Sequence, residues 1–245
     1  MKKLQCIFLS IAILFALSLP AFAAEGNTPI EFLLPTVVEY DTPDPQPANL
    51  ISIESCPRND GTGIDVTVGN LGVDGLDSVS ISVSATDHPI AQTQTAYVLP
   101  ILGKTFGFDI PMTKCDMTYY IHVIVTDGGQ TQQFTRTAGL EYSEERLALM
   151  DWGQGRGFSS RQDSLNYHFQ KHHNDIGVNA SNIVQYLGMA IDTFNDTLYN
   201  IDNYKVVLQA QQPGYEPAHK YTHKTNYRFI IYGDGTDTIY TFGGK

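Results

Sequence analysis

Residues 119–137, which read YYIHVIVTDGGQTQQFTRT, carry the clearest fold signal in the chain. Two runs suited to β-strands, residues 119–126 and 130–137, flank the tripeptide Asp127-Gly128-Gly129. Because glycine readily adopts the positive φ angles of a tight turn, this segment is predicted to be a β-hairpin.

Short alternating apolar runs continue this pattern toward the N-terminus. They comprise Ile51 and Ile53; Ile64, Val66 and Val68; Val79, Ile81 and Val83; and Phe106, Phe108 and Ile110. About seven short strands with regular turns are typical of a β-sandwich, which we place at residues 49–140. This region, including residues 66–72 (VTVGNLG), resembles fibronectin type III and related immunoglobulin-like domains. The resemblance implies an all-β immunoglobulin-like fold and names no ligand.

The first 48 residues differ from the sandwich in composition. Lys2 and Lys3 precede an apolar stretch at 7–17, so residues 1–23 are predicted to be a signal peptide cleaved near Ala23. A retained membrane anchor fits less well, because a bilayer-spanning helix needs roughly 20 apolar residues. We therefore expect a secreted or periplasmic mature protein with no membrane anchor. Residues 24–48 contain five prolines and are predicted to form an extended leader.

Cys56 and Cys115 are the two cysteines that remain after signal cleavage. An even pair in an oxidising compartment is usually joined, so a disulfide between them is predicted. The alternative is a pair of buried thiols.

Composition and charge limit the classes of function. With 245 residues, 42% hydrophobic and 17% charged, the chain should fold and has room for two domains. The net charge of −11 excludes a chain that is basic throughout, as many nucleic-acid binders are. The acid excess lies in residues 25–149, with 17 acids against 5 Lys and Arg, whereas residues 150–245 hold 9 against 8. A local site for an anionic substrate is therefore allowed in the C-terminal part.

The last third reads as a linker followed by a small α+β domain. Residues 141–158, acidic and then glycine-spaced as DWGQGRG, are predicted to be the linker. Two helices should follow, the first capped by Ser159 or Ser160 and the second by Ser181. Their apolar faces would hold Leu165, His168, Phe169, His172 and Ile176 in the first, and Ile183, Leu187, Ala190, Ile191, Phe194 and Leu198 in the second. An antiparallel sheet of three or four strands, at 204–210, 219–223, 227–232 and 238–242, completes the domain at 159–245.

Five of the seven histidines lie in this C-terminal domain beside lysine and arginine. The helix offers His168, Lys171 and His172. The strand region offers Arg228 and the secondary candidates His219, Lys220 and His223. Cleaving RNA without a metal needs a base for the 2′-hydroxyl, an acid for the leaving oxygen and cations for the phosphate. These side chains supply every group that the reaction requires, and it needs no cofactor.

The same residues resemble a family. The helical motif LNYHFQKH at 165–172, Gly177, the helix at 186–187 and the closing YTFGG at 240–244 resemble toxin ribonucleases of the barnase, EndoU, colicin and RelE fold. The resemblance implies that His168, Lys171 and His172 are catalytic. It also implies that Arg228 binds phosphate and that Thr241 is the polar residue of the final strand. RNA is then the expected substrate, and the existence of an inhibitor protein stays open.

Two other functions remain open from the sequence. His168 and His172 are four residues apart, as are His219 and His223, so a His-ligated zinc protein is one alternative. The other is a secreted binding or adhesion protein without catalytic activity, in which the histidines are structural. A serine hydrolase finds no support, because the chain has no Gly-x-Ser-x-Gly elbow.

Overall fold

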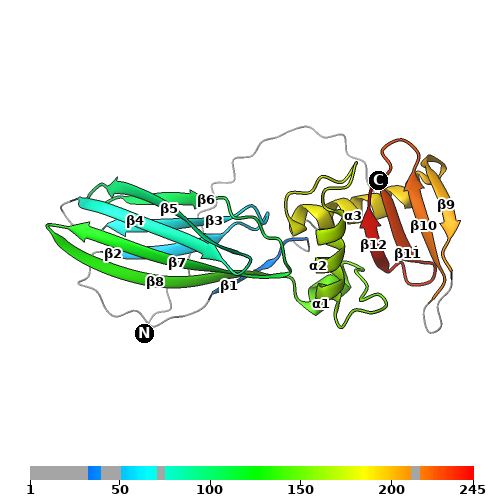
Figure 1. Cartoon of the computed structure of the whole chain (residues 1–245), viewed down its shortest axis with the longest axis horizontal. Coiled ribbons are helices and arrows are strands. Elements are labelled where there is room, and N and C mark those ends of the chain that lie inside the picture. Colours follow the sequence, from blue (N-terminus) through cyan, green and yellow to red (C-terminus); the bar gives the residue numbers. More distant parts are fainter. Residues whose placement is uncertain (1–32, 40–50, 71–74, 211–215) are drawn as a thin grey trace.

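The computed structural model describes residues 33–39, 51–70, 75–210 and 216–245. A sandwich of two β-sheets occupies one end of the molecule, and a small α+β part occupies the other (Figure 1). The coarse architecture predicted from the sequence is therefore confirmed. The predicted signal peptide and most of the predicted leader lie outside the described residues.

The sandwich pairs a five-stranded sheet with a three-stranded sheet. The larger sheet has the order β1 (Thr36–Glu39), β8 (Gln130–Glu141), β7 (Asp116–Asp127), β4 (Leu76–Ala85) and β5 (His88–Val98). The smaller sheet consists of β2 (Ile51–Pro57), β3 (Ile64–Asn70) and β6 (Gly103–Phe108). The predicted hairpin joins β7 to β8, with Asp127 opposite Gln130 and φ angles of 53° and 75° at Gly128 and Gly129. Alternate residues of β3, β4 and β7 are buried between the sheets, as the alternating apolar residues of the sequence predicted.

The predicted leader needs one correction, because Thr36–Glu39 pair antiparallel with β8 as strand β1. The prolines that argued for an extended chain do not prevent this pairing, since Pro35 precedes the strand and an edge strand tolerates proline at its start.

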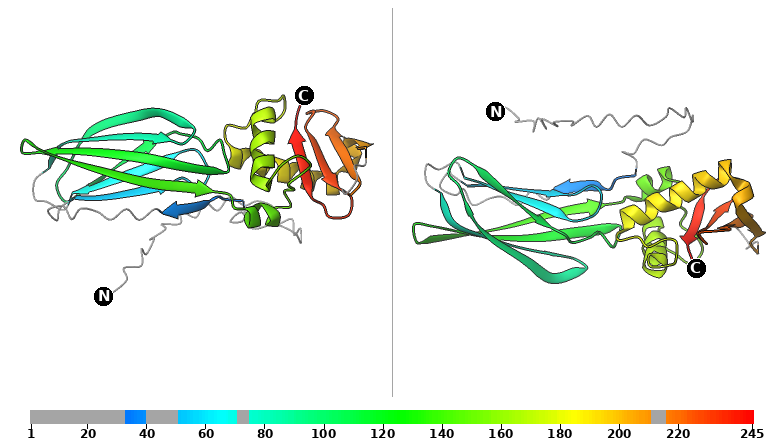
Figure 2. Two further views of the ribbon diagram at one scale, coloured as in Figure 1. Left: turned by 60° about the horizontal axis from the view of Figure 1, so that its bottom comes forward. Right: turned by 90° about the horizontal axis from the view of Figure 1, so that it is seen from above.

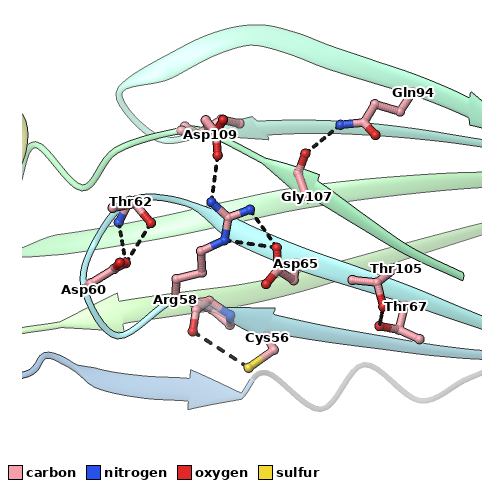
Figure 3. A network of polar contacts seen from close by, with 12 residues as sticks. Cys56, Arg58, Asp60, Thr62, Asp65, Thr67, Gln94, Thr105, Gly107 and Asp109 are labelled. Carbon is pink, nitrogen blue, oxygen red and sulfur yellow. Dashed lines mark hydrogen bonds and ion pairs between the residues drawn. The ribbon is translucent and has the colours of Figure 1, made fainter. Parts of the chain in front are cut away.

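Polar side chains brace the smaller sheet at one end and link it to strand β5 of the larger sheet (Figure 3). Arg58 donates to Asp65 Oδ1 from Nε at 3.0 Å and from Nη2 at 2.7 Å, and to Asp109 from Nη1 at 2.7 Å. On strand β5, Gln94 Nε2 donates to the Gly107 carbonyl of β6 at 2.6 Å. The Gln94 amide thereby bonds a carbonyl of β6, which is an edge strand of the smaller sheet.

The predicted disulfide is wrong in this structure, because Cys56 and Cys115 are not joined. Cys56 is exposed on β2, and its Sγ lies 3.8 Å from the Pro57 carbonyl (Figure 3). Cys115 is buried just before β7, with its Sγ 3.8 Å from the Gln162 carbonyl of the C-terminal part. One thiol faces outward from the smaller sheet and the other packs between the two parts, so the even count did not indicate a pair.

Residues 141–158, which were predicted to be a linker, are folded and packed against the C-terminal sheet. It contains helix α1 (Glu144–Leu149), which Ser143 caps, and the fully buried Trp152. The Ile239 amide donates to the Asp151 carbonyl at 2.7 Å, and the Gly153 amide donates to the Ile239 carbonyl at 2.8 Å. Residues 151–153 thereby extend the C-terminal sheet by a parallel bridge. Gly153 is closely packed rather than part of a flexible linker, because a Cβ there would lie 2.6 Å from the Thr238 side chain.

The C-terminal part contains two longer helices and a four-stranded antiparallel sheet. Helix α2 (Arg161–His172) and helix α3 (Ile183–Tyr199) precede the short 3-10 helix η2 (Ile201–Asn203). The sheet order is β12 (Ile239–Gly243), β11 (Phe229–Gly233), β10 (Ala218–His223) and β9 (Tyr204–Leu208). Two helix ends differ from prediction. Asn182 rather than Ser181 caps α3, and α2 stops at His172, so Ile176 lies beyond it and is 66% exposed.

The early end of α2 has a visible cause. The Asp175 carboxylate lies 2.7 Å from His172 Nδ1 and accepts a bond from the Gly244 amide at 3.1 Å. Gly177 then turns the chain with φ at 91°. The chain is thereby held against the end of β12 instead of continuing as a helix.

Helix α2 is bonded to α1, and α3 is bonded to the end of the sandwich. The Glu144 carboxylate accepts bonds from the amides of Arg161 at 3.0 Å and Gln162 at 2.9 Å, in the first turn of α2. The Ile183 amide at the start of α3 donates to the Met112 carbonyl at 2.9 Å. Figure 2 shows α3 running from this junction along the C-terminal sheet. Among the described residues, no helix is long and apolar enough to cross a membrane.

Candidate functional site

The two faces of the C-terminal sheet have different neighbours. Tyr221, Ile230 and Phe242 lie in register across three strands and face α3. Their neighbours Lys220, Ile231 and Thr241, also in register, therefore lie on the opposite face. Helix α2 borders that second face, since His168 contacts Thr241. The second face is where the candidate site lies.

A pocket of about 420 Å³ opens between α2, this face and the glycine-spaced loop that follows α1. Its lining residues come from four regions: Gly155, Arg156 and Phe158; Tyr167, His168 and Lys171; Gln209, Ala210, Glu216 and Ala218; and Ile231, Tyr240 and Thr241. Three of the five leading candidates from the sequence, His168, Lys171 and Thr241, thus line one pocket.

His168 is the most buried of the candidate groups, with 8% of the residue exposed. Its Nε2 lies 3.1 Å from Thr241 Oγ1, within hydrogen-bonding distance. Burial, with smaller contributions from the charges of His172 and Lys171, lowers the pKa of His168 to about 4. The imidazole is therefore neutral at pH 7 and able to accept a proton.

Two cations lie at the pocket. Lys171 follows His168 by one helical turn, and its Nζ is 5.6 Å from the centre of the Tyr167 ring. Arg156 is exposed in the glycine-spaced loop, where Gly155 and Gly157 have φ angles of 67° and 88°. These angles favour glycine, so the spacing of the loop is what allows it to curve over the pocket.

Glu216 stabilises the wall of the pocket formed by the β11–β12 hairpin. Its carboxylate accepts bonds from the Gly235 amide at 2.9 Å, the Thr236 amide at 3.1 Å and the Tyr240 hydroxyl at 3.0 Å. The Thr236 hydroxyl also donates to this carboxylate and is the largest cause of its lowered pKa. These bonds favour the ionised carboxylate and tie the hairpin to Glu216.

His172 lies beside the pocket rather than on its lining. Its ring stacks on His168 with 6.0 Å between centroids and meets the Phe229 ring edge-on at 5.6 Å. The Asp175 carboxylate binds His172 Nδ1, as described above. Lys220, another candidate, has its Nζ 3.7 Å from the centre of the same Phe229 ring. His172 and Lys220 thus meet at Phe229, next to the pocket.

The structure does not bring the remaining candidates to the pocket. Arg228 Nε donates to the Gly177 carbonyl, and Arg228 is not among the lining residues. His219 and His223 alternate with Lys220 on β10, so they lie on the face toward α3. His219 Nδ1 is 2.6 Å from Asp234, and His223 Nδ1 accepts from the Thr225 amide at 3.2 Å. Strand parity separates these groups from His168.

Among the pocket residues, sequence reasoning did not single out Arg156, Phe158, Tyr167, Glu216 or Tyr240. Tyr167 and Tyr240 stand inside the two quoted motifs, next to His168 and Thr241. Arg156 and Phe158 lie in the stretch interpreted as a linker. The paired glycines around Arg156 were the available signal, because they indicate a curved loop as readily as a flexible one.

The zinc alternative finds no site in the part of the chain that the structure describes. That part contains no group of three or more His, Cys, Asp or Glu side chains placed to hold a metal ion. The two histidine pairs that suggested zinc lie apart. His168 and His172 are on α2, whereas His219 and His223 are on the face of the sheet toward α3.

Comparison with known proteins gives little. No family model matches the chain, and no curated protein matches it. One solved structure is similar, a chaperone–tip adhesion subunit pre-assembly complex from archaic chaperone-usher Csu pili of Acinetobacter baumannii. It is 8% identical over 79% of this chain and 83% of that chain, with a TM-score of 0.23. A likeness of this size carries no argument about fold or function.

Proposed function

We propose that the pocket cleaves RNA without a metal ion, by attack of a 2′-hydroxyl on the adjacent phosphate. The observation that carries the proposal is the meeting of a neutral His168, the cation Lys171 and the hydroxyl of Thr241 around one pocket. A neutral imidazole accepts the hydroxyl proton, and a cation offsets the charge that gathers on the phosphate.

His168 is the proposed general base. Its pKa of about 4 makes it a weak base in the empty pocket. A phosphate bound beside it raises that pKa, because a nearby negative charge favours the imidazolium form. The base thus strengthens when substrate binds, and Thr241 holds its ring in position at 3.1 Å.

Lys171 and Arg156 are the proposed phosphate-binding groups, because both line the pocket with His168. In the proposed step the 2′-oxygen forms a bond to phosphorus and gives its proton to His168. The bond from phosphorus to the 5′-oxygen breaks, and the leaving oxygen takes a proton from the Lys171 ammonium group. His168 then returns its proton through solvent, which restores both groups.

The resemblance to toxin ribonucleases supports the same assignment for His168, Lys171 and Thr241. Arg228, which the resemblance implied as a phosphate-binding residue, holds the Gly177 carbonyl instead, so Arg156 takes that role in this proposal. His172 acts on the pocket through its stacked ring and is a positioning residue here.

We extend the proposal to the whole chain. An exported toxin-like protein, released by cleavage of residues 1–23, would carry the ribonuclease-like part behind an immunoglobulin-like sandwich. The basic start and apolar stretch of the predicted signal support extracellular or periplasmic placement.

Cleavage rates of three mature chains test the proposal. Wild type, His168→Gln and His223→Gln would be incubated with labelled RNA in excess chelator. His168→Gln should lose about 10²- to 10⁴-fold in rate, the usual contribution of a general base. His223→Gln is the matched control on the opposite face and should keep the wild-type rate. Full cleavage by His168→Gln would reject the base, and a wild type that leaves RNA intact would favour the non-catalytic binding protein.

A further inference from the structure

An aromatic pair lies at the pocket beside its cations. The rings of Phe158 and Tyr167 are 5.2 Å apart and tilted by 49°. Tyr167 is 47% exposed, although its neighbour His168 on the same helix is buried. Tyr167 is therefore an exposed aromatic residue at the pocket, with Lys171 Nζ over its ring at 5.6 Å from the centre.

We propose that Tyr167, backed by Phe158, stacks an unpaired nucleobase next to the phosphate that is cleaved, so that the substrate is single-stranded RNA. This inference rests on the proposed RNA cleavage. Proteins that bind single strands commonly combine a cationic track for the backbone with aromatic side chains on which bases stack.

Helix geometry places the two functions side by side. Tyr167 and Lys171 are four residues apart on α2 and share one face, with Lys171 Nζ 5.6 Å from the Tyr167 ring centre. In a nucleotide the base and its phosphate are separated by one sugar, so a base on Tyr167 leaves its phosphate near Lys171. His168, the next residue after Tyr167, faces the same pocket.

Phe158 gives the stacking surface a fixed support. Its ring packs against His168 with 5.7 Å between centroids, and its carbonyl accepts a bond from Gln154 Nε2 at 2.5 Å. Phe158 is thus partly buried while Tyr167 is exposed. A base inside an A-form duplex is already stacked and cannot reach this surface, whereas a base of a single strand can be splayed out.

Removing the ring should weaken RNA binding and not the chemical step. Base–aromatic stacking is worth about 1–3 kcal/mol per base, so Tyr167→Ala should raise KM for a single-stranded oligonucleotide by about 5- to 150-fold. The kcat value should stay within about threefold, since His168 and Lys171 remain. Tyr167→Phe, which keeps the ring, should resemble wild type.

Steady-state cleavage by the mature chain tests the inference. The variants would be measured on a single strand, on its duplex and on the same strand with one abasic sugar beside the cleaved bond. Tyr199→Ala is the control, because Tyr199 is 70% exposed at the end of α3 and does not line the pocket. The inference predicts that Tyr167→Ala weakens cleavage of the normal strand and leaves the abasic strand unchanged.

The outcomes separate the two proposals. Absence of cleavage by wild type on every RNA would overturn the proposed function and this inference together. Cleavage with an unchanged KM in Tyr167→Ala, or equal cleavage of duplex and single strand, would overturn the stacking site alone.

Discussion

Replacing His168 with glutamine should remove a pH dependence of stability, and the size of this effect follows from burial. The unfolded histidine has its ordinary pKa of 6.5, and the folded one titrates at about 4. Between these values the unfolded state holds more protons, so acid favours unfolding. The contribution of neutral His168 to the free energy of unfolding is fully present above pH 6.5 and is lost as the pH falls toward 4.

The expected magnitude is about 2 kcal/mol between pH 7 and pH 4.5, from a pKa lowered to about 4 in the folded state. His168→Gln has no such titration. The difference in free energy of unfolding between wild type and His168→Gln should therefore shift by about 2 kcal/mol in favour of the variant between pH 7 and pH 4.5, whatever the variant loses at pH 7 through altered packing.

Urea unfolding followed by tryptophan fluorescence is a suitable assay. The chain has a single tryptophan, Trp152, whose ring centroid lies 6.2 Å from that of His168. His122→Gln on strand β7 of the sandwich controls for loss of a histidine and should keep the wild-type dependence. If the free energy of unfolding changed equally with pH in wild type and in His168→Gln, the assignment of His168 as a buried, neutral imidazole would be refuted.

Three other measurements follow from the structure. Because burial raises the pKa of the Cys115 thiol, Cys115 should resist alkylation in the folded protein and react only after unfolding; modification at the rate of a simple thiol would contradict its place between the two parts. Glu144→Ala should lower the unfolding free energy by about 1–2 kcal/mol, because two amides of α2 lose their acceptor, while Glu145→Ala should change it little; equal effects would count against this cap. Cleavage should fall in acid, and the acid limb of kcat/KM should lie near pH 4, the pKa of His168 in the free protein. The acid limb of kcat should lie at higher pH, because bound phosphate raises the pKa of His168. If the two limbs coincide, no phosphate binds beside this base.

The parts of the fold that the sequence predicted are those governed by local patterning. Alternation and the glycines of residues 127–129 were enough for the β7–β8 hairpin. The four C-terminal strands lie within one or two residues of the predicted ranges. Local spacing also placed His168 and Lys171 on one helix.

Errors arose where distant segments decide the outcome. The end of α2 depends on Asp175 reaching the Gly244 amide, which lies 69 residues away in sequence. The glycine-spaced stretch around Trp152 joins β12 through Ile239, and no local signal indicates that bridge. Cysteine counting could not reveal that Cys115 packs against α2.

The positions of the candidate site residues were also predicted correctly where local spacing decides them, and wrongly where strand register decides them. The histidines of β10 looked equivalent to Lys220 in sequence, but alternation of side chains sends His219 and His223 to the α3 face. One residue of register therefore decides whether a side chain reaches the pocket, and register is a property of the whole sheet.

The most direct test of the central claim is the chemical identity of the RNA ends after incubation with the mature protein in excess chelator. We expect 2′,3′-cyclic phosphate and 5′-hydroxyl ends, because the 2′-oxygen attacks phosphorus and the 5′-oxygen leaves. These ends should disappear with His168→Gln. Intact RNA, or ends of another chemistry such as 5′-phosphate and 3′-hydroxyl, would contradict it.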